Sequence, residues 1–355
     1  MKEIKELVEI SKYAGERLDL VQAGGGNSSV KLLNGKMFIK ASGYSLSEVE
    51  ESYGYSTVLT NQIADIVNNQ QIINLKSKNE RESLASSLVK KSTLDNKNRP
   101  SIETLLHSFL LKYTLHTHPI ALNVILSNKK WKNILESIFL ENELVFVEYQ
   151  TPGIDLALAL KNQLIKFKST PNILFLQNHG LIITSNKKEE IEILTEYVLS
   201  KVEDFLNIDL SRHKLTTKIS KALRKNNDYN TISFLSDDIF LNDVLKKNKS
   251  LFFKPPFCPD SFVFCGACAI EITDLNKLEK IKKYKEKFYS YPKILIYKNN
   301  VFIISKNVKK AKEIEDVLKF HLMILSNESS DINFLKDEEL IYLSNWEAEK
   351  FRQKL

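Results

Sequence analysis

Cysteine, glycine and proline are all scarce in this chain of 355 residues, which contains 3 Cys, 10 Gly and 8 Pro. The three cysteines form an odd set confined to residues 258–268, which excludes a disulfide scaffold and indicates a reducing compartment. Low hydrophobicity and extreme net charge are also missing, since 43% of the residues are hydrophobic, so a mainly disordered chain is excluded. The length and apolar content suffice for one large or two medium domains with full-sized cores.

No region of the chain concentrates charge of one sign. The 51 basic and 44 acidic residues give a net charge of +7, and lysines alternate with glutamates in segments such as residues 277–287. This pattern is typical of solvated helix surfaces. A nucleic-acid interface would need basic residues clustered on one face together with aromatic residues. The sequence shows no such stripe, so we expect no nucleic-acid partner.

Long hydrophobic runs are missing as well. The most apolar stretch, residues 105–126, is interrupted by Lys112 and three histidines, so it does not fit a membrane span. The N-terminus is charged from residue 2, and its apolar residues follow helical spacing. That pattern predicts an amphipathic helix over about residues 2–19 rather than a signal peptide. We therefore expect a cytoplasmic protein with no membrane partner.

Helix-like and strand-like segments alternate along the chain, which predicts an α/β fold. Two candidate hairpins require antiparallel strand pairs within the sheet. The run 261–265 (SFVFC) is expected to be a further strand. Residues 1–215 are expected to form a metal-binding domain, and residues 251–355 a C-terminal α/β domain. The polar, lysine-rich segment 216–250 is expected to be the linker.

The two hairpin sequences resemble each other. PNILFLQNHGLIITSN at 171–186 aligns without gaps with PKILIYKNNVFIISKN at 292–307, with seven identities in sixteen positions. Chance similarity between hairpins is one explanation, and a duplicated domain is the other and better one. Because His179 is aligned with Asn300, we expect the second copy to have lost a functional histidine and to hold no metal site.

Three histidines form the most informative pattern. In YTLHTHPI, strand periodicity places His116 and His118 on one side of a strand, and His179 follows in a hairpin turn. Three neutral imidazoles with an open fourth position describe a catalytic zinc site. Histidines satisfied within a core are the alternative interpretation of the same pattern.

An acidic residue and two small-residue turns complete the candidate site. RPSIETLLH at 99–107 predicts a helix that begins with Ser101 as its N-cap and has Glu103 in its first turn. Glu103 is either an ordinary first-turn glutamate or, near a metal, a ligand and general base. The turns GGGNSS at 24–29 and ASG at 41–43 would let backbone N–H groups approach an anion, although a tight turn into a strand explains them equally well.

Taken in order, GGGNSS, IKASG, PSIE, LHTHP and NHGLII resemble the class II aldolase/adducin superfamily over residues 1–206. The remainder, including CPDSFVFCG, resembles the aldolase portion of bifunctional rhamnulose-1-phosphate aldolase/alcohol dehydrogenase proteins. The sequence has no nucleotide-binding glycine fingerprint, so we expect the dehydrogenase half to be absent. Two departures from the superfamily pattern stand out: Ile102 replaces a second phosphate-binding serine of some members, and Lys40-Ala41 replaces Thr-Pro.

The resemblance implies a three-layer α/β/α sandwich with a mixed, largely antiparallel central sheet, followed by a smaller degenerate C-terminal repeat. It implies one Zn²⁺ per chain, or another divalent metal, held by His116, His118 and His179. Glu103 would be a resting-state metal ligand and the catalytic base. The residues that would bind the substrate phosphate are Gly26, Asn27, Ser42, Gly43 and Ser101.

The function implied is that of a class II aldolase-type lyase. Its substrate would be a phosphorylated ketose such as a rhamnulose- or fuculose-1-phosphate-like sugar, cleaved to dihydroxyacetone phosphate and an aldehyde. A homo-oligomer, either dimer or tetramer, is expected. Two alternatives remain: a sugar-phosphate 4-epimerase or dehydratase of the same superfamily, and a non-enzymatic, adducin-like interaction module.

Overall fold

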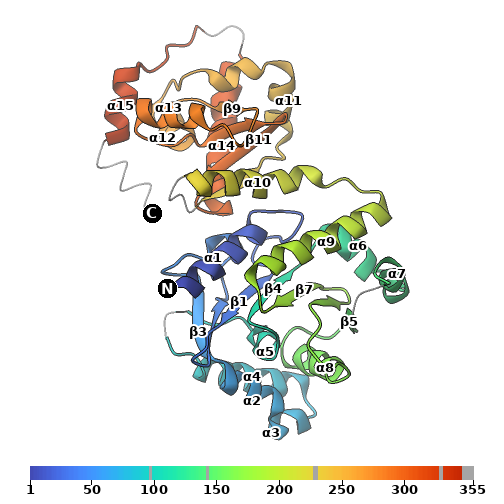
Figure 1. Cartoon of the computed structure of the whole chain (residues 1–355). Coiled ribbons are helices and arrows are strands. Elements are labelled where there is room, and N and C mark those ends of the chain that lie inside the picture. The colour runs from blue at the N-terminus through green and yellow to red at the C-terminus, as the bar shows by residue number, and fades with distance from the viewer. Residues whose placement is uncertain (96–97, 141–143, 227–230, 328–330, 346–355) are drawn as a thin grey trace. The chain divides into compact units, whose positions relative to one another are not determined.

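A computed structural model describes residues 1–95, 98–140, 144–226, 231–327 and 331–345 of the chain. The chain divides into two compact units, Met1–Leu210 and Ser211–Leu355, shown from blue to red along the sequence in Figure 1. Each unit contains its own sheet. No helix within the described ranges is long and apolar enough to cross a bilayer.

The first unit is built on a seven-stranded sheet of order β3-β2-β1-β4-β7-β6-β5. Every neighbouring pair is antiparallel except β5 and β6, which are parallel. The strands are β1 (Asn27–Lys31), β2 (Lys36–Lys40), β3 (Tyr55–Leu59), β4 (Tyr113–Thr117), β5 (Leu144–Val147), β6 (Ile173–Leu176) and β7 (Gly180–Ser185).

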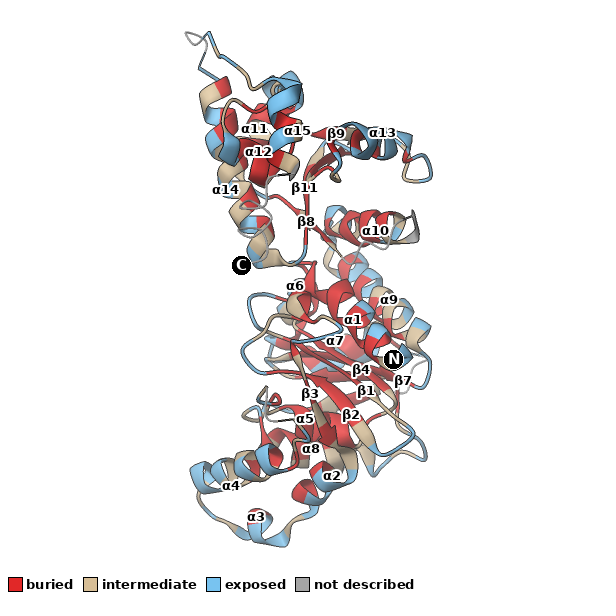
Figure 2. Ribbon diagram, turned by 90° about the vertical axis from the view of Figure 1, so that its left-hand side faces the viewer, coloured by how far each residue is buried: buried red, intermediate tan, exposed pale blue. Residues whose placement is uncertain are grey.

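Helices cover both faces of this sheet, and the strands between them are coloured largely as buried in the ribbon of Figure 2. Those on one face are α1 (Lys2–Gly15), α6 (Ile120–Leu126), α7 (Trp131–Ile138) and α9 (Lys188–Leu206). Those on the other are α2 (Thr60–Asn68), α3 (Gln70–Asn74), α4 (Lys78–Lys91), α5 (Thr104–Ser108) and α8 (Ile154–Leu164). A short 3₁₀ helix, η1 (Leu46–Glu48), follows β2. The predicted three-layer α/β/α sandwich with a mixed, largely antiparallel sheet is confirmed.

The second unit has a four-stranded sheet of order β8-β11-β10-β9. Its strands are β8 (Ile232–Leu235), β9 (Ile270–Ile272), β10 (Ile294–Tyr297) and β11 (Asn300–Ser305). Its helices are α10 (Ser211–Asn226), α11 (Ile239–Lys247), η2 (Lys249–Phe253), α12 (Pro259–Cys265), α13 (Glu279–Phe288), α14 (Val308–Leu325) and α15 (Asp337–Asn345). Apolar clusters on both faces again give three layers.

The two sheets share one topology. The order β8-β11-β10-β9 repeats β4-β7-β6-β5, with two antiparallel pairs followed by one parallel pair in each case. The helix after each hairpin, α9 or α14, packs on the corresponding sheet face. The second unit therefore repeats the second half of the first, and it contains no counterpart of β1–β3 among its described strands. This agrees with the duplication inferred from the sequence.

The hairpin turns differ in length, which corrects the ungapped alignment. Leu176 pairs with Gly180 across a three-residue connection, whereas Tyr297 pairs with Asn300 across a two-residue connection. Asn300 therefore occupies the place of Gly180, and His179 has no counterpart in the second hairpin. The second copy has lost the position itself as well as the histidine side chain.

The expected linker is folded. The segment 216–250 contains most of α10, all of β8 and α11, and the start of η2, and it belongs to the second unit. Helix α10 is amphipathic and buries Leu215, Ile219 and Leu223, while its lysines lie on the solvent side. The high lysine content was therefore wrongly interpreted as a sign of a linker.

The expected strand SFVFC is instead most of α12. Pro259 stands at the start of this helix, where its fixed φ is favourable and its missing N–H costs nothing. A short apolar run does not by itself distinguish a strand from a buried helix.

Candidate functional site

Strand β4 carries two of the candidate ligands at the centre of the sheet. His116 is fully buried and pairs with Asn27 on β1 and with Ile182 on β7. His118 follows the end of the strand, where its N–H donates to the Leu20 carbonyl at 2.9 Å. The Nε2 atoms of the two histidines lie 3.1 Å apart, as expected for residues two apart on one strand.

The hairpin between β6 and β7 brings in the third imidazole. Asn178 has a φ of 52°, in the left-handed region, which turns the chain just before His179. A Cβ at Gly180 would overlap the Thr117 carbonyl oxygen, so glycine allows β7 to lie this close to β4. As a result, the Nε2 atom of His179 lies 3.2 Å from that of His116.

The protonation of the cluster suits a metal. His116 Nδ1 lies 3.0 Å from the Leu181 carbonyl oxygen, which can only accept, so Nδ1 carries the proton and Nε2 presents a lone pair. Burial lowers the pKa of His116 well below its usual range and also lowers the pKa of His118, which keeps both imidazoles neutral at pH 7. Ligand atoms of His116, His118 and His179 all lie within 4.8 Å of one another. Three imidazole nitrogens this close together, with the Nε2 lone pair of His116 among them, are a donor set that fits a divalent metal such as zinc.

Glu103 lies in contact with two of these imidazoles. One carboxylate oxygen of Glu103 lies 3.2 Å from His179 Nε2 and 3.5 Å from His116 Nε2. Glu103 is buried, with only 8% of its surface exposed. The other oxygen accepts a hydrogen bond from Asn27 Nδ2 at 2.8 Å. Burial raises the pKa of Glu103, but the two imidazoles and the Asn27 amide outweigh this effect and hold the pKa well below its usual range. The carboxylate is therefore ionised and able to bind a metal or accept a proton.

The turn before α5 holds Glu103 in place and differs slightly from expectation. The helix begins at Thr104 instead of near Ser101, so Glu103 occupies the N-cap position. Ser101 Oγ accepts hydrogen bonds from the Glu103 N–H at 3.3 Å and from Asn27 Nδ2 at 2.7 Å. Asn27 thus links β1, Ser101 and Glu103, while its own Oδ1 is buried without a hydrogen-bond partner.

The residues predicted to bind phosphate surround the same end of the sheet. Gly26 has a φ of 74°, and a Cβ there would lie 2.8 Å from the His116 carbonyl oxygen. The segment containing Ser42 and Gly43 lies beside Ser101, because an isolated bridge joins Ala41 to Pro100 and the Ser42 N–H donates to the Arg99 carbonyl at 2.8 Å. These contacts bring the two turns and Ser101 to one region. Phosphate binding by Gly26, Asn27, Ser42, Gly43 and Ser101 stays a prediction.

Two residues near the cluster were not assigned a role from the sequence. His107 is fully buried, and its Nδ1 lies 2.7 Å from Ser29 Oγ. Burial lowers the pKa of His107 to about 4, and its spacing of four residues from Glu103 was the available signal. Lys40, the last residue of β2, interacts electrostatically with Glu103 and His118. In the sequence, Lys40 was notable only because the superfamily pattern has Thr at this position.

The chain is similar to a curated bacterial protein. The chain is 28% identical over 224 residues to the "Uncharacterized oxidoreductase YuxG" of Bacillus subtilis (strain 168), covering 60% of this chain and 31% of that protein. The chain therefore spans about a third of the length of this curated relative.

Solved structures with similarity to the chain include an N-terminal class II aldolase domain from Thermoplasma acidophilum. It is 27% identical with a TM-score of 0.49, and the match covers 57% of this chain and 93% of that one. An L-fuculose 1-phosphate aldolase is 17% identical with a TM-score of 0.40, covering 60% of this chain and 93% of that one. YgbL from Klebsiella pneumoniae, a putative aldolase/epimerase/decarboxylase, is 17% identical with a TM-score of 0.42, covering 58% of this chain and 89% of that one.

The family comparison is decisive because it extends over more than half of the sequence. Residues 5–200 match the family described as "Class II Aldolase and Adducin N-terminal domain", and this range contains every candidate ligand described above. The chain belongs to the class II aldolase and adducin family.

Proposed function

We propose that the first unit is a divalent-metal-dependent lyase of the aldolase type, that its metal is zinc, and that its substrate is a phosphorylated ketose. The observation that carries this proposal is the contact of the Glu103 carboxylate with two imidazoles of the His116, His118 and His179 cluster. A carboxylate at that place combines a metal ligand with a proton acceptor beside the reacting atoms. An interaction module would have no need of either.

The three imidazoles and Glu103 would hold the metal. A divalent cation in such a site supplies Lewis-acid polarisation of a substrate oxygen and stabilises negative charge that develops during reaction. His116 contributes a fixed lone pair, because its Nδ1–H is held by the Leu181 carbonyl. His116 lies on a central strand of the sheet, and His118, His179 and Glu103 lie in short connections directly next to strands or a helix.

Glu103 would move the proton. In the cleavage direction the bond between the α-carbon and the β-carbon of the ketose breaks, counted from its carbonyl. The bonding electrons pass to the α-carbon, and the hydroxyl on the β-carbon loses its proton to form the aldehyde. The ketose fragment then takes up a proton at carbon to give dihydroxyacetone phosphate. A carboxylate whose low pKa keeps it ionised, and which Asn27 orients through one oxygen, can exchange that proton through the other.

We also propose that the two small-residue turns and Ser101 receive the substrate phosphate. The donor groups available include backbone N–H groups of the turns and the Ser42 and Ser101 hydroxyls, while Asn27 holds Ser101 in place through its amide. The name of one similar structure, L-fuculose 1-phosphate aldolase, belongs to an enzyme of a sugar 1-phosphate, which supports testing this class first. We further propose a homo-oligomer, measurable as a solution mass of two or four chains, and a cytoplasmic location, which the three free cysteines support.

The experiment that tests the function is aldol cleavage of ketose 1-phosphates by the zinc-loaded protein, followed by detection of the released aldehyde. Cleavage of at least one such sugar is expected. No cleavage together with epimerised or dehydrated product would assign the site to the related sugar-phosphate chemistries. No metal binding and no turnover would favour the adducin-like interaction module.

Glu103→Gln tests the proton-transfer role directly. We expect this variant to retain metal, because an amide oxygen still faces the cluster, and to lose about 10²–10⁴-fold in the rate of cleavage. The exchange of solvent deuterium into dihydroxyacetone phosphate should fall in parallel. Glu6→Gln is the matched control, since Glu6 on α1 is equally buried, accepts from the Tyr113 hydroxyl and forms an ion pair with Lys2 at 3.7 Å. Exchange at the parental rate by Glu103→Gln would overturn the assignment.

A further inference from the structure

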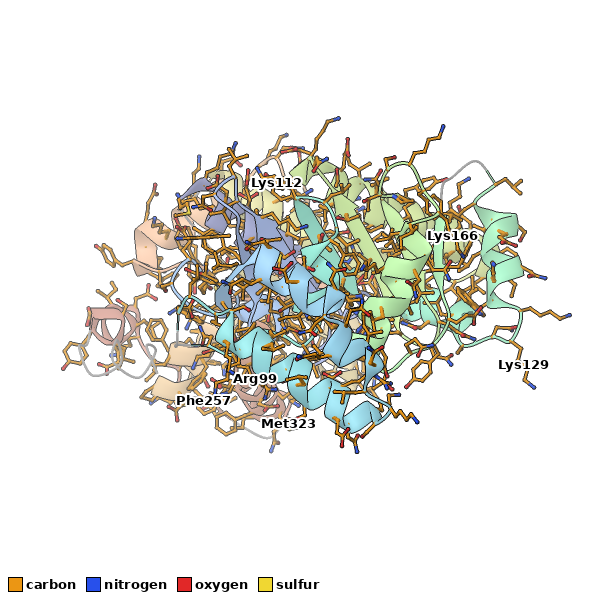
Figure 3. All side chains as sticks on the ribbon, turned by 90° about the horizontal axis from the view of Figure 1, so that it is seen from below. Arg99, Lys112, Lys129, Lys166, Phe257 and Met323 are labelled. Carbon is orange, nitrogen blue, oxygen red and sulfur yellow. The ribbon has the colours of Figure 1, made fainter. Side chains whose placement is uncertain are left out.

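Lys40 is a buried cation beside the candidate metal cluster. It is the last residue of β2 and is only 3% exposed. Surface lysines of the first unit, such as Lys129 between α6 and α7, project away from the protein, as Figure 3 shows. Burying an ammonium group is costly unless its donors find partners, so the surroundings of Lys40 require an explanation.

The partners of Lys40 leave much of its hydrogen-bonding capacity unused. Its ammonium donates to the Gly24 carbonyl at 3.2 Å, the one hydrogen bond that the described residues provide for it, and no carboxylate among them lies within ion-pair distance. An ammonium has three N–H donors. Burial lowers the pKa of Lys40 to about 8, so the group still carries its charge over most of the population at pH 7.

A second lysine in the same sheet, half-buried at the end of the neighbouring strand, shows the contrast. Lys31 ends β1, the neighbouring strand, and burial lowers its pKa to about 8 as well. Its ammonium donates to the Ser108 carbonyl at 2.7 Å and also to the Leu110 carbonyl. Lys31 is thus held by two carbonyl oxygens of the protein, whereas Lys40 has one long hydrogen bond and donors to spare.

The position of Lys40 indicates what kind of group could accept hydrogen bonds from its remaining N–H donors. Gly24 belongs to the first small-residue turn, and Ser42 in the second turn follows two residues after Lys40; both residues are exposed. On the other side, Lys40 interacts electrostatically with Glu103 and with His118 of the metal cluster. The ammonium therefore lies between the metal ligands and the two turns. An anion entering this region would be repelled by Glu103 and Glu48, and Lys40 supplies the opposing charge.

We propose that the Lys40 ammonium binds the anionic group of the substrate, a phosphate monoester, and makes this site selective for phosphorylated over neutral sugars. The proposal rests on the proposed function for the identity of the reacting sugar. Two N–H donors and one positive charge on a buried, sheet-anchored side chain would bind phosphate oxygens by charge-assisted hydrogen bonds. The turns would then contribute N–H and hydroxyl donors around a charge that is already in place.

The test is the affinity of the zinc-loaded full chain for inorganic phosphate, measured by titration calorimetry without any sugar. Lys40→Met should raise the dissociation constant about 10–100-fold. Lys40→Arg, which keeps the charge, should recover most of the affinity. Lys31→Met is the control, because it removes a half-buried lysine of the neighbouring strand that already donates to two protein carbonyls, and phosphate affinity should stay within about threefold of the parent.

Three results would overturn the proposal: no phosphate binding by the parent, unchanged binding by a folded Lys40→Met, or an equal loss in a folded Lys31→Met. Tighter binding of glycolate than of phosphate would also contradict the proposal, because Lys40 would then be assigned to the carboxylate of sugar acids.

If Lys40→Met does not fold, the ammonium resonances of the parent protein labelled with ¹⁵N-lysine provide the test, and Lys40→Arg serves to assign the Lys40 resonance. A phosphate-dependent shift of the Lys40 resonance supports the proposal, and no shift contradicts it. Because phosphate binding needs no turnover, its failure is distinguishable from failure of the aldolase assignment.

Discussion

Both units contain the same half-sandwich, a four-stranded sheet with helices on both faces. The candidate site lies in the first unit, and the described part of the second unit has no equivalent of it. Helix α6 begins two residues after His118, and α11 begins two residues after Asp237, so the paired strands β4 and β8 correspond. His116 pairs with Ile182, and Leu235 makes the corresponding pair with Phe302. The histidines of β4 are thus replaced by Leu235 and Asp237. The same half-sandwich therefore forms without these histidines, so the fold does not depend on them.

The comparison also shows how much of the site comes from outside the repeated half. Glu103, Asn27 and the two small-residue turns all lie before β4 in the sequence, and the second unit has no described strands equivalent to β1–β3. Introducing histidines into the second copy would therefore not supply a counterpart of Glu103. The candidate site draws its residues from both halves of the first unit.

The largest effect that would sharpen this comparison concerns metal content. The parent should bind one zinc per chain, and His116→Ala/His118→Ala should bind less than about a tenth of that, because two of three nitrogen ligands are gone. Mass spectrometry of the purified, untagged protein measures it. Asp237→Ala/Asn300→Ala in the second copy is the control and should leave the content unchanged. Two zinc ions per chain in the parent would break the distinction between the copies.

A smaller effect concerns the glycine that separates the two hairpins. Gly180→Val should destabilise the first unit by about 2–4 kcal/mol, because the new side chain would overlap the Thr117 carbonyl and push β7 from β4. Urea unfolding followed by circular dichroism measures the loss, and zinc affinity should fall with it. Asn300→Val changes the corresponding position of the second hairpin, which already carries a side chain, and should cost less than about 1 kcal/mol. Equal losses at the two positions would contradict the difference in turn geometry.

The smallest expected effect is shared by both units. Burial lowers the pKa of His107 in the first unit and of His321 in the second to about 4. The unfolded chain takes up these protons near pH 6.5 and the folded chain only near pH 4, so stability is full above pH 6.5 and decreases as the pH falls toward 4. The loss should be about 1–3 kcal/mol per histidine in metal-free protein. His107→Asn, which keeps a hydrogen bond to Ser29 but does not titrate, should flatten the dependence for the first unit. A dependence as steep as that of the parent would show that other groups cause it.

Sequence periodicity predicted the core of the site because strands and helices impose fixed spacing. The alternation in LHTHP placed His116 and His118 together, and the hairpin pattern placed His179 at a turn. The linker prediction failed because lysines on one face of α10 conceal buried leucines on the other. The ungapped alignment failed because one residue in a turn changes strand pairing without changing the pattern of apolar residues. The surroundings of Lys40 depend on which loop carbonyl lies nearby, and no local pattern encodes that.

The pairing of Asn27 with His116 makes assembly of the site depend on correct strand alignment. Asn27 orients Glu103 from the strand that lies directly beside a metal ligand. A slip of one residue between β1 and β4 would turn Asn27 to the opposite face of the sheet, where it could reach neither Ser101 nor Glu103. Misregistered chains would therefore lack the Asn27 contact with Glu103 even if all three histidines were present. Under the proposed function, activity would then report on correct strand pairing as well as on chemistry.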